Sequence, residues 1–208
     1  MRLAAGTLAL SLVLSSCSSV RIPWITSSSE VADGIDLIAV IPVERTAPPA
    51  EDAAPAKVAP EAEEVVTAAI YRALSSTHEW RFVPDLAVTD TMRNIDSLDS
   101  ANEKALALGR AVEADGVLFG SVWRYVERVG DGTDVEEPAA VGFRLRLLSV
   151  GSGEVIWEQS FERTQTSRRT SMLEWVPFWE AGRGWLTAVD LTHEGVDRLM
   201  QDLRRSLN

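Results

Sequence analysis

One segment near the carboxyl end of the chain comes close to a zinc-protease motif. His193, Glu194 and Asp197 stand at positions one, two and five of the pattern H-E-x-x-H. In that motif two histidines on one helix face bind zinc together with a third ligand, and the glutamate acts as a base. Here an aspartate replaces the second histidine, and the other histidine of the chain, His78, lies in an unrelated segment. The pattern favours a solvated helix face, and we expect no metal site.

The sequence lacks the usual motifs for nucleophilic catalysis and phosphate binding. A nucleophile elbow has the form G-x-S-x-G, but Gly120 and Ser121 continue into an apolar run. The glycine pairs at 151/153 and 182/184 do not stand between a parallel strand and a helix, as phosphate loops do. We therefore expect no enzyme, no catalytic residue and no cofactor. An envelope hydrolase remains an alternative, in which loss of His78 or His193 would abolish activity without unfolding the protein.

The amino terminus has the residues needed for covalent lipidation. An apolar run over residues 3–14 has the length of a signal-peptide core, whereas a membrane-spanning helix needs roughly 20 apolar residues. The next residues, LSSC at 14–17, resemble a bacterial lipobox, in which the cysteine is acylated and becomes the first residue. Cys17 is the only cysteine in 208 residues, so no disulfide can form. We predict a signal peptide at 1–16 and a lipid on Cys17, and the following Ser18 favours sorting to the outer membrane.

A group of aromatic and basic residues near position 175 is the best candidate for a contact site. Four large aromatic residues stand within eleven positions, and two arginines precede them: Trp175, Phe178, Trp179, Trp185, Arg168 and Arg169. Tryptophan and arginine are common at the centres of protein interfaces, and tryptophan also suits the lipid interface. The alternative is a loop whose rings are buried against the sheet. We take these six residues as a candidate partner- or membrane-binding site.

Composition and charge indicate one acidic domain. The formal net charge is −11, and removal of Arg2 with the signal peptide changes it to −12. Because nucleic-acid affinity rests largely on Lys and Arg, nucleic-acid binding is excluded as a function class. We expect the lipidated cysteine and a serine-rich tether at 17–34, and one periplasmic domain at 35–208. The tether can extend to at most about 60 Å, and a stretch rich in proline and alanine at 46–60 predicts a long loop.

The first half of the domain has the pattern of alternating strands and helices. A continuous apolar run at 35–43 predicts a strand covered on both faces, as in parallel sheets. Ser100 and Glu103 have the spacing of a capping box, which predicts a helix start. In chain order we expect a strand at 35–43, a helix from Pro60 to about Leu74, a strand at 80–84, a helix from Ser100 to about Val112, and a strand at 116–128. This is a βαβαβ opening with two right-handed crossover helices.

The second half changes to an antiparallel pattern. Alternation over 143–147 and a second β-rich run at 155–164 predict a hairpin, and Gly151-Ser152-Gly153 predicts a three-residue loop with Gly153 in the left-handed conformation. This register pairs Leu147 with Trp157, Phe143 with Phe161 and Arg146 with Glu158. A final helix at 185–206 carries an apolar stripe of Leu186, Val189, Val196, Leu199, Met200 and Leu203. The expected fold is a single α/β domain with a mixed sheet.

Three segments resemble a family of bacterial envelope lipoproteins. They are IAVIPV at 38–43, LGRAVEADGVLFGSV at 108–122 and SVGSGEVIWEQS at 149–160. The family includes the curli-secretion lipoprotein CsgG, the penicillin-binding-protein activator LpoB and the amino-terminal domain of TolB. The resemblance covers about residues 35–207 and implies a TolB-N/CsgG-like fold and a role as an assembly, secretion or activation partner.

The resemblance implies a non-enzymatic scaffold or regulator of an envelope assembly, anchored in the outer membrane and facing the periplasm. Its partner would be an envelope protein that the sequence does not name, and a homo-oligomer is compatible with it. The alternative is a secretion-channel subunit of the curli type, with ring-shaped oligomers. Pore strands need about 9–11 alternating residues. The segment at 129–137 is too short, and the segment at 165–184 lacks sustained alternation, so we do not expect a pore.

Overall fold

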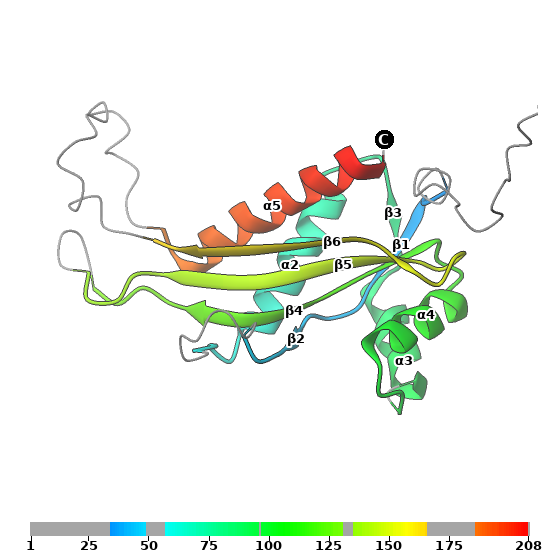
Figure 1. Cartoon of the computed structure of the whole chain (residues 1–208), viewed down its shortest axis with the longest axis horizontal. Coiled ribbons are helices and arrows are strands. Elements are labelled where there is room, and N and C mark those ends of the chain that lie inside the picture. Colours follow the sequence, from blue (N-terminus) through cyan, green and yellow to red (C-terminus); the bar gives the residue numbers. More distant parts are fainter. Residues whose placement is uncertain (1–33, 49–56, 96, 131–134, 166–185, 208) are drawn as a thin grey trace, which may run out of the picture.

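The computed structural model describes residues 34–48, 57–95, 97–130, 135–165 and 186–207. Within them a six-stranded mixed sheet is flanked by helices (Figure 1). The elements in chain order are β1 Leu37–Val40, β2 Glu44–Arg45, α2 Ala62–Ser75, β3 Arg81–Phe82, α3 Asp85–Ile95, α4 Ala101–Ala111, β4 Gly116–Val126, β5 Ala140–Ser149, β6 Val155–Thr164 and α5 Ala188–Leu207.

The parallel half of the sheet is centred on β1. This strand pairs in parallel with β3 on one side and with β4 on the other, with Ile38 opposite both Phe82 and Gly116. Ile38, Ala39 and Val40 are fully buried, which confirms the prediction of a strand covered on both faces. The sheet order β3-β1-β4-β5-β6 then continues through the antiparallel strands.

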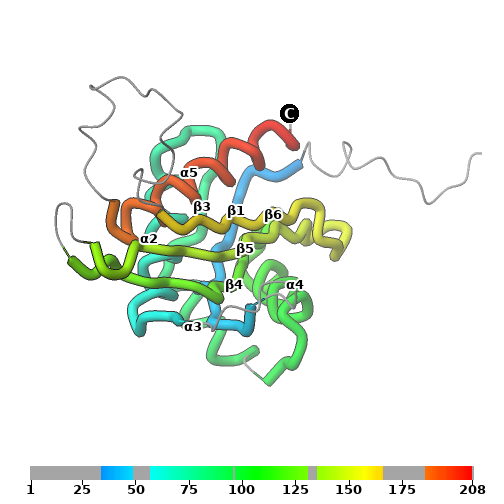
Figure 2. The backbone as a smooth tube through the Cα atoms, turned by 60° about the vertical axis from the view of Figure 1, so that its left-hand side comes forward, coloured from blue at the N-terminus to red at the C-terminus, as the bar shows by residue number. Residues whose placement is uncertain are grey.

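Helices cover both faces of this sheet (Figures 1 and 2). α2 and α5 lie on one face and pack on side chains such as Leu118, Val122 and Leu145. α3 and α4 lie on the other face, over Val117 and Phe119. Alternate residues of β4 therefore enter two separate apolar clusters, because successive side chains of a strand point to opposite faces.

The second crossover contains a helix that the sequence pattern did not predict. α3 begins directly after Pro84, whose carbonyl accepts a hydrogen bond from the amide of Val88 at 3.2 Å. The expectation of two crossover helices is therefore wrong, since α3 and α4 both lie between β3 and β4. Val88 is fully buried, and Met92 and Ile95 are partly buried against the same cluster. These three residues recur at helical spacing, so the sequence contained a short apolar stripe that the prediction overlooked.

The start of α4 is placed correctly, but its capping interaction differs. Ser100 is the N-cap residue with extended backbone angles, yet its side chain makes no capping hydrogen bond. The hydrogen bond that the serine side chain makes in a capping box is therefore absent here. The end of α4 has Glu113 in the left-handed region (φ 54°), and the amide of Ala114 donates to Gly109 O at 2.9 Å, which is the hydrogen bond of a Schellman motif.

Part of the predicted loop at 46–60 belongs to the sheet. β2 pairs in parallel with β4, and the amide of Thr46 donates to Val122 O at 3.0 Å. The chain then returns to β4, where Val58 bridges to Tyr125. The prediction missed these contacts because two-residue pairings leave no periodic pattern in the sequence.

The predicted hairpin register is confirmed along most of its length. Phe143 pairs with Phe161, Arg146 with Glu158 and Leu147 with Trp157. The register then shifts by one residue at Leu148, and Ser149 pairs with Glu154 across a loop of four residues, not three. Gly153 has φ +73° as expected.

The final helix is close to its predicted bounds, but one residue of its stripe is wrong. Val189 is 36% exposed, while Ala188, Leu191 and Gly195 are buried on the face toward the sheet. Gly195 allows this close approach. A Cβ atom there would lie 2.5 Å from Phe161 Cδ1 and 2.8 Å from Phe143 Cζ.

Candidate partner-binding surface

The residues predicted to bind a partner or to carry lipid lie outside the described residues: Cys17, Arg168, Arg169, Trp175, Phe178, Trp179 and Trp185. Their interactions therefore remain predictions. The structure does describe the two points where the aromatic segment is attached, Gln165 after β6 and Leu186 before α5. These attachment points show from which part of the domain the segment begins and ends.

The first attachment point is held by the sheet. Thr164 pairs with Ala140 at the start of β5, and the amide of Gln165 donates to Ala139 O at 2.9 Å. β6 therefore remains hydrogen-bonded up to the residue where the described chain stops.

The second attachment point is held by the cap of α5. The Thr187 hydroxyl and amide both donate to Asp190 Oδ2, at 2.8 and 3.0 Å, and the Asp190 amide donates to Thr187 Oγ1 at 3.1 Å. This is a reciprocal capping box. The hydrogen bonds from Thr187 lower the pKa of Asp190 below its ordinary value of 3.8, because they stabilise the ionised carboxylate.

Glu127 joins the start of α5, beside the second attachment point, to the end of β4. Its Oε1 accepts a hydrogen bond from the Tyr125 hydroxyl at 3.3 Å, and its Oε2 accepts one from the Ala188 amide at 3.4 Å. A carboxylate is favourable at a helix amino terminus. Burial, and then the nearby charge of Glu127, raise the pKa of Tyr125 well above its ordinary value, so this tyrosine stays protonated and donates. We name this end of the sheet, where Glu127, Gln165 and Ala188 lie, the loop pole.

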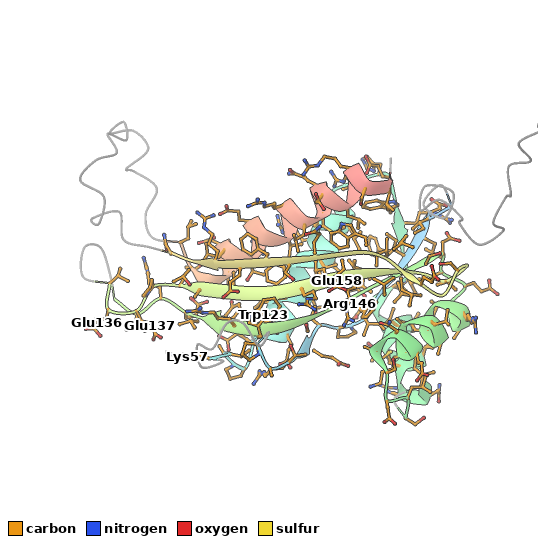
Figure 3. The ribbon with its side chains drawn as sticks, viewed as in Figure 1. Lys57, Trp123, Glu136, Glu137, Arg146 and Glu158 are labelled. Carbon is orange, nitrogen blue, oxygen red and sulfur yellow. The ribbon has the colours of Figure 1, made fainter. Side chains whose placement is uncertain are left out.

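Apolar and charged side chains are exposed together at the loop pole. Val129 is 48% exposed in the β4–β5 connection, and Val189 is 36% exposed at the start of α5. The amide of Val129 donates to Glu137 O at 2.9 Å, and Lys57 forms an ion pair with Glu137 at 2.5 Å. Figure 3 shows Lys57, Glu136 and Glu137 at this end of the molecule. Sequence reasoning missed this surface, since neither valine belongs to a recognisable motif.

On the face of the sheet that carries α3 and α4, strand β5 contributes two arginine side chains. Arg144 forms an ion pair with Glu158 at 3.1 Å, and Arg146 lies 4.5 Å above the ring of Phe119. Arg146 stands opposite Glu158 in register, as expected, but Glu158 forms its ion pair with Arg144. Trp123, 4% exposed, lies over Gly142, where a Cβ would stand 2.6 Å from the indole nitrogen (Figure 3).

The zinc-like segment of α5 forms ion pairs with neighbouring elements. Glu194 pairs with Arg163 of β6, and Asp197 pairs with Arg72 of α2 at 2.8 Å. Across the described residues, no group of three or more His, Cys, Asp or Glu side chains could hold a metal ion. The carboxylates of this segment therefore link α5 to β6 and α2.

The place where open α/β sheets usually bind ligands is occupied by the chain itself. Such ligands lie beyond the carboxyl ends of parallel strands at the point where the strand order reverses, here between β1 and β4. The Ile41 amide donates to Leu118 O at 2.9 Å, and β2 continues along β4 beyond this point.

In the part of the chain that the structure describes, no helix is long and apolar enough to span a bilayer.

Several solved structures are similar to this chain at low sequence identity. The PelC dodecamer from Paraburkholderia phytofirmans is 18% identical, with 81% of this chain and 87% of that chain covered and a TM-score of 0.49. A lipoprotein from Neisseria meningitidis is 16% identical, covering 82% and 99%, with a TM-score of 0.48. The LpoB C-terminal domain from Escherichia coli is 22% identical, covering 66% and 95%, with a TM-score of 0.42.

Comparison of the sequence with protein families gives a match over residues 62–162. No curated protein matches the chain. The family match concerns the LpoB part of the resemblance and lends no support to the curli-secretion or TolB parts. Residues 62–162, which run from the first residue of α2 into β6, match the family described as the peptidoglycan-synthase activator LpoB.

Proposed function

We propose that this protein is an outer-membrane lipoprotein of the LpoB type, which regulates a peptidoglycan synthase through protein contacts and is not itself an enzyme. The observation that carries the proposal is the match of residues 62–162 to the family of peptidoglycan-synthase activators. The lipobox at Cys17 supports the membrane anchor. Acylation with two or more chains gives stable attachment, because each buried CH₂ contributes about 0.8 kcal/mol.

The arrangement of the domain supports contact with a partner at the loop pole. Gly34, where the tether ends, precedes β1, and Ile35 lies beside Gly116, which pairs with Ser149. The aromatic segment is attached at the other end of the same strands, beyond Thr164. Ten residues of β5 separate these ends, which corresponds to about 33 Å. The tether therefore joins the domain at the pole opposite to the attachment points of the aromatic segment.

The chemistry of the aromatic segment suits a protein partner. Trp175, Phe178, Trp179 and Trp185 can supply anchoring rings, and Arg168 and Arg169 can supply a charged rim. The exposed Val129 and Val189 extend this surface with apolar side chains on described residues. The site thus combines aromatic anchors with a charged rim, as protein interfaces do.

The first experiment is a pull-down from crosslinked membranes with the full-length lipidated protein. We compare the wild type with Trp175→Ala/Phe178→Ala/Trp179→Ala and, as a control, with Glu103→Ala/Arg110→Ala, which alters exposed residues of α4 without changing the net charge. Mass spectrometry identifies the captured proteins, and circular dichroism tests whether each variant folds. We expect a peptidoglycan synthase in the wild-type and control samples and its loss from the folded triple variant.

Other outcomes would change the proposal in specific ways. If the triple variant unfolds, its rings belong to the core and the site assignment is wrong. If the folded triple variant retains the synthase, the contact lies elsewhere on the domain. If the wild type captures no synthase and does not change the rate of glycan polymerisation by a purified synthase, the regulatory function itself is wrong.

A further inference from the structure

Two exposed apolar side chains lie close to the root of the tether. Phe82 is 38% exposed and Leu86 is 71% exposed. Phe82 pairs in register with Ile38, four residues after Gly34, where the described chain begins. Leu86 follows Phe82 by four residues, in the first turn of α3. We call these two residues the tether-pole patch.

The aromatic ring that Phe82 contacts stays uncharged at neutral pH. The ring of Tyr71 packs edge-on against Phe82 with 5.9 Å between centroids, and its hydroxyl donates to Val40 O at 3.4 Å. Burial, and then the charge of Asp85, raise the pKa of Tyr71 to about 12, so the phenol does not ionise near neutral pH. Transfer of a leucine or phenylalanine side chain from water to an apolar environment is favourable, so burial of this exposed pair would stabilise a contact.

We propose that the tether-pole patch rests on the bilayer that holds the lipidated Cys17. This inference depends on the proposed lipid anchor. The seventeen residues 18–34 can extend to at most about 60 Å, so a lipid on Cys17 would keep the root at Gly34 near the membrane. A short flexible linker gives effective concentrations in the millimolar range. The contact of two apolar side chains with lipid is too weak to hold a free protein on a bilayer. It is sufficient to orient a protein that a lipid anchor already holds there.

The charges around the patch do not supply the attraction. Arg81 pairs with Asp36 at 2.6 Å, and Arg93 pairs with Asp90 at 3.0 Å. Because these arginines are neutralised by neighbouring carboxylates, contact with lipid rests on apolar burial. The contact should therefore change little with salt, unlike the binding of a basic surface to anionic lipid.

The test measures the depth of a fluorescent label on the full-length protein in phosphatidylcholine vesicles. Acylation blocks the thiol of Cys17, so a label that reacts with thiols marks only an introduced cysteine. Leu86→Cys places it in the patch, and Val129→Cys is the matched control, since both positions are exposed and Val129 lies at the loop pole. With a quencher on the lipid acyl chains, we expect several-fold stronger quenching at position 86 than at position 129, unchanged at high salt.

Each alternative result contradicts a distinct part of the inference. Equal quenching at both positions, in protein that floats with the vesicles, overturns the patch but leaves the anchor intact. Shielding of position 86 that rises with protein concentration in detergent, without vesicles, means that a second copy covers the patch. If neither labelled variant floats with the vesicles and mass spectrometry finds no lipid on either, the proposed anchor is wrong, and the inference is then wrong as well.

Discussion

Gly195 shows how a single residue determines the distance between α5 and the sheet. It lies under Phe143 and Phe161, whose ring centroids are 5.6 Å apart. Glycine inside a helix costs about 1 kcal/mol relative to alanine, so its presence in α5 has to be explained by packing. The close approach of the two rings supplies that explanation.

We predict that Gly195→Ala destabilises the protein despite the better helix propensity of alanine. The new Cβ would stand 2.5 Å from Phe161, and overpacking of this kind costs about 1–3 kcal/mol. Urea denaturation measures the free energy of unfolding. Arg198→Ala, on the exposed side of the same helix, is the control and should change it little. Adding Phe161→Leu to Gly195→Ala should recover part of the lost stability. A Gly195→Ala variant more stable than the wild type would show that the two rings move aside freely.

At the scale of the elements, the amino terminus of α5 carries a pH-dependent cap. We predict that Thr187→Ala lowers stability by about 1 kcal/mol near neutral pH, as loss of an N-cap does. The pKa of Asp190 is lowered in the folded state. Its contribution is therefore present above the unfolded value of 3.8 and is lost as the pH falls through the lower folded value.

Denaturation at a series of pH values measures this dependence. The difference in stability between the wild type and Asp190→Asn should be largest near neutral pH and should shrink as the pH falls below 3.8. A difference that stays constant with pH would mean that the carboxylate charge of Asp190 does not contribute to the cap.

The turn between β5 and β6 provides a second test at this scale. Gly153 has φ +73°, which side chains rarely adopt, while Gly151 has no positive φ and no crowding, its nearest neighbour being 3.8 Å away. We predict that Gly153→Ala costs about 1 kcal/mol and that Gly151→Ala is nearly neutral. Thermal denaturation of the two variants distinguishes them, and equal losses would indicate that the conformation of Gly153 is not the cause.

The elements could be predicted from the sequence in proportion to the strength of their periodic pattern. α2, β4 and the β5–β6 register were predicted because their buried residues recur at helix or strand spacing. β2 spans Glu44–Arg45 and is stabilised by its pairing with β4, so local spacing contains little information about it. α3 differs, because Val88, Met92 and Ile95 recur at helical spacing and this short stripe was overlooked.

At the scale of the whole molecule, the domain has two poles, one at the root of the tether and one at the ends of the aromatic segment. We predict that the mature protein begins at Cys17 and carries acyl chains, and that Cys17→Ser releases the domain from the membrane fraction. Intact-mass spectrometry and membrane fractionation measure both properties. A wild-type chain that still contains residues 1–16, or a Cys17→Ser variant that remains with the membrane after a high-salt wash, would contradict the lipobox.

The sequence suggests the residue types of the candidate site, which lies outside the described residues, but does not suggest which residues form the loop pole. Trp175 and its neighbours are recognisable because large aromatics are rarely grouped in a loop with proline and glycine. Val129, Val189 and Glu127 lie at the loop pole, yet each looks ordinary in the sequence. They come together through the hydrogen bond of Glu127 with Ala188, which joins residues 61 positions apart.

The sequence by itself determined the features that depend on neighbouring residues. These are the buried strand β1, most of the hairpin register and the left-handed Gly153, because each follows from spacing or backbone sterics within a few positions. The tertiary structure alone decided which elements share an end of the sheet. It placed Phe82 beside Ile38 near the tether root and brought the ends of β4, β6 and the start of α5 together. These arrangements depend on contacts between distant residues, which no local pattern encodes.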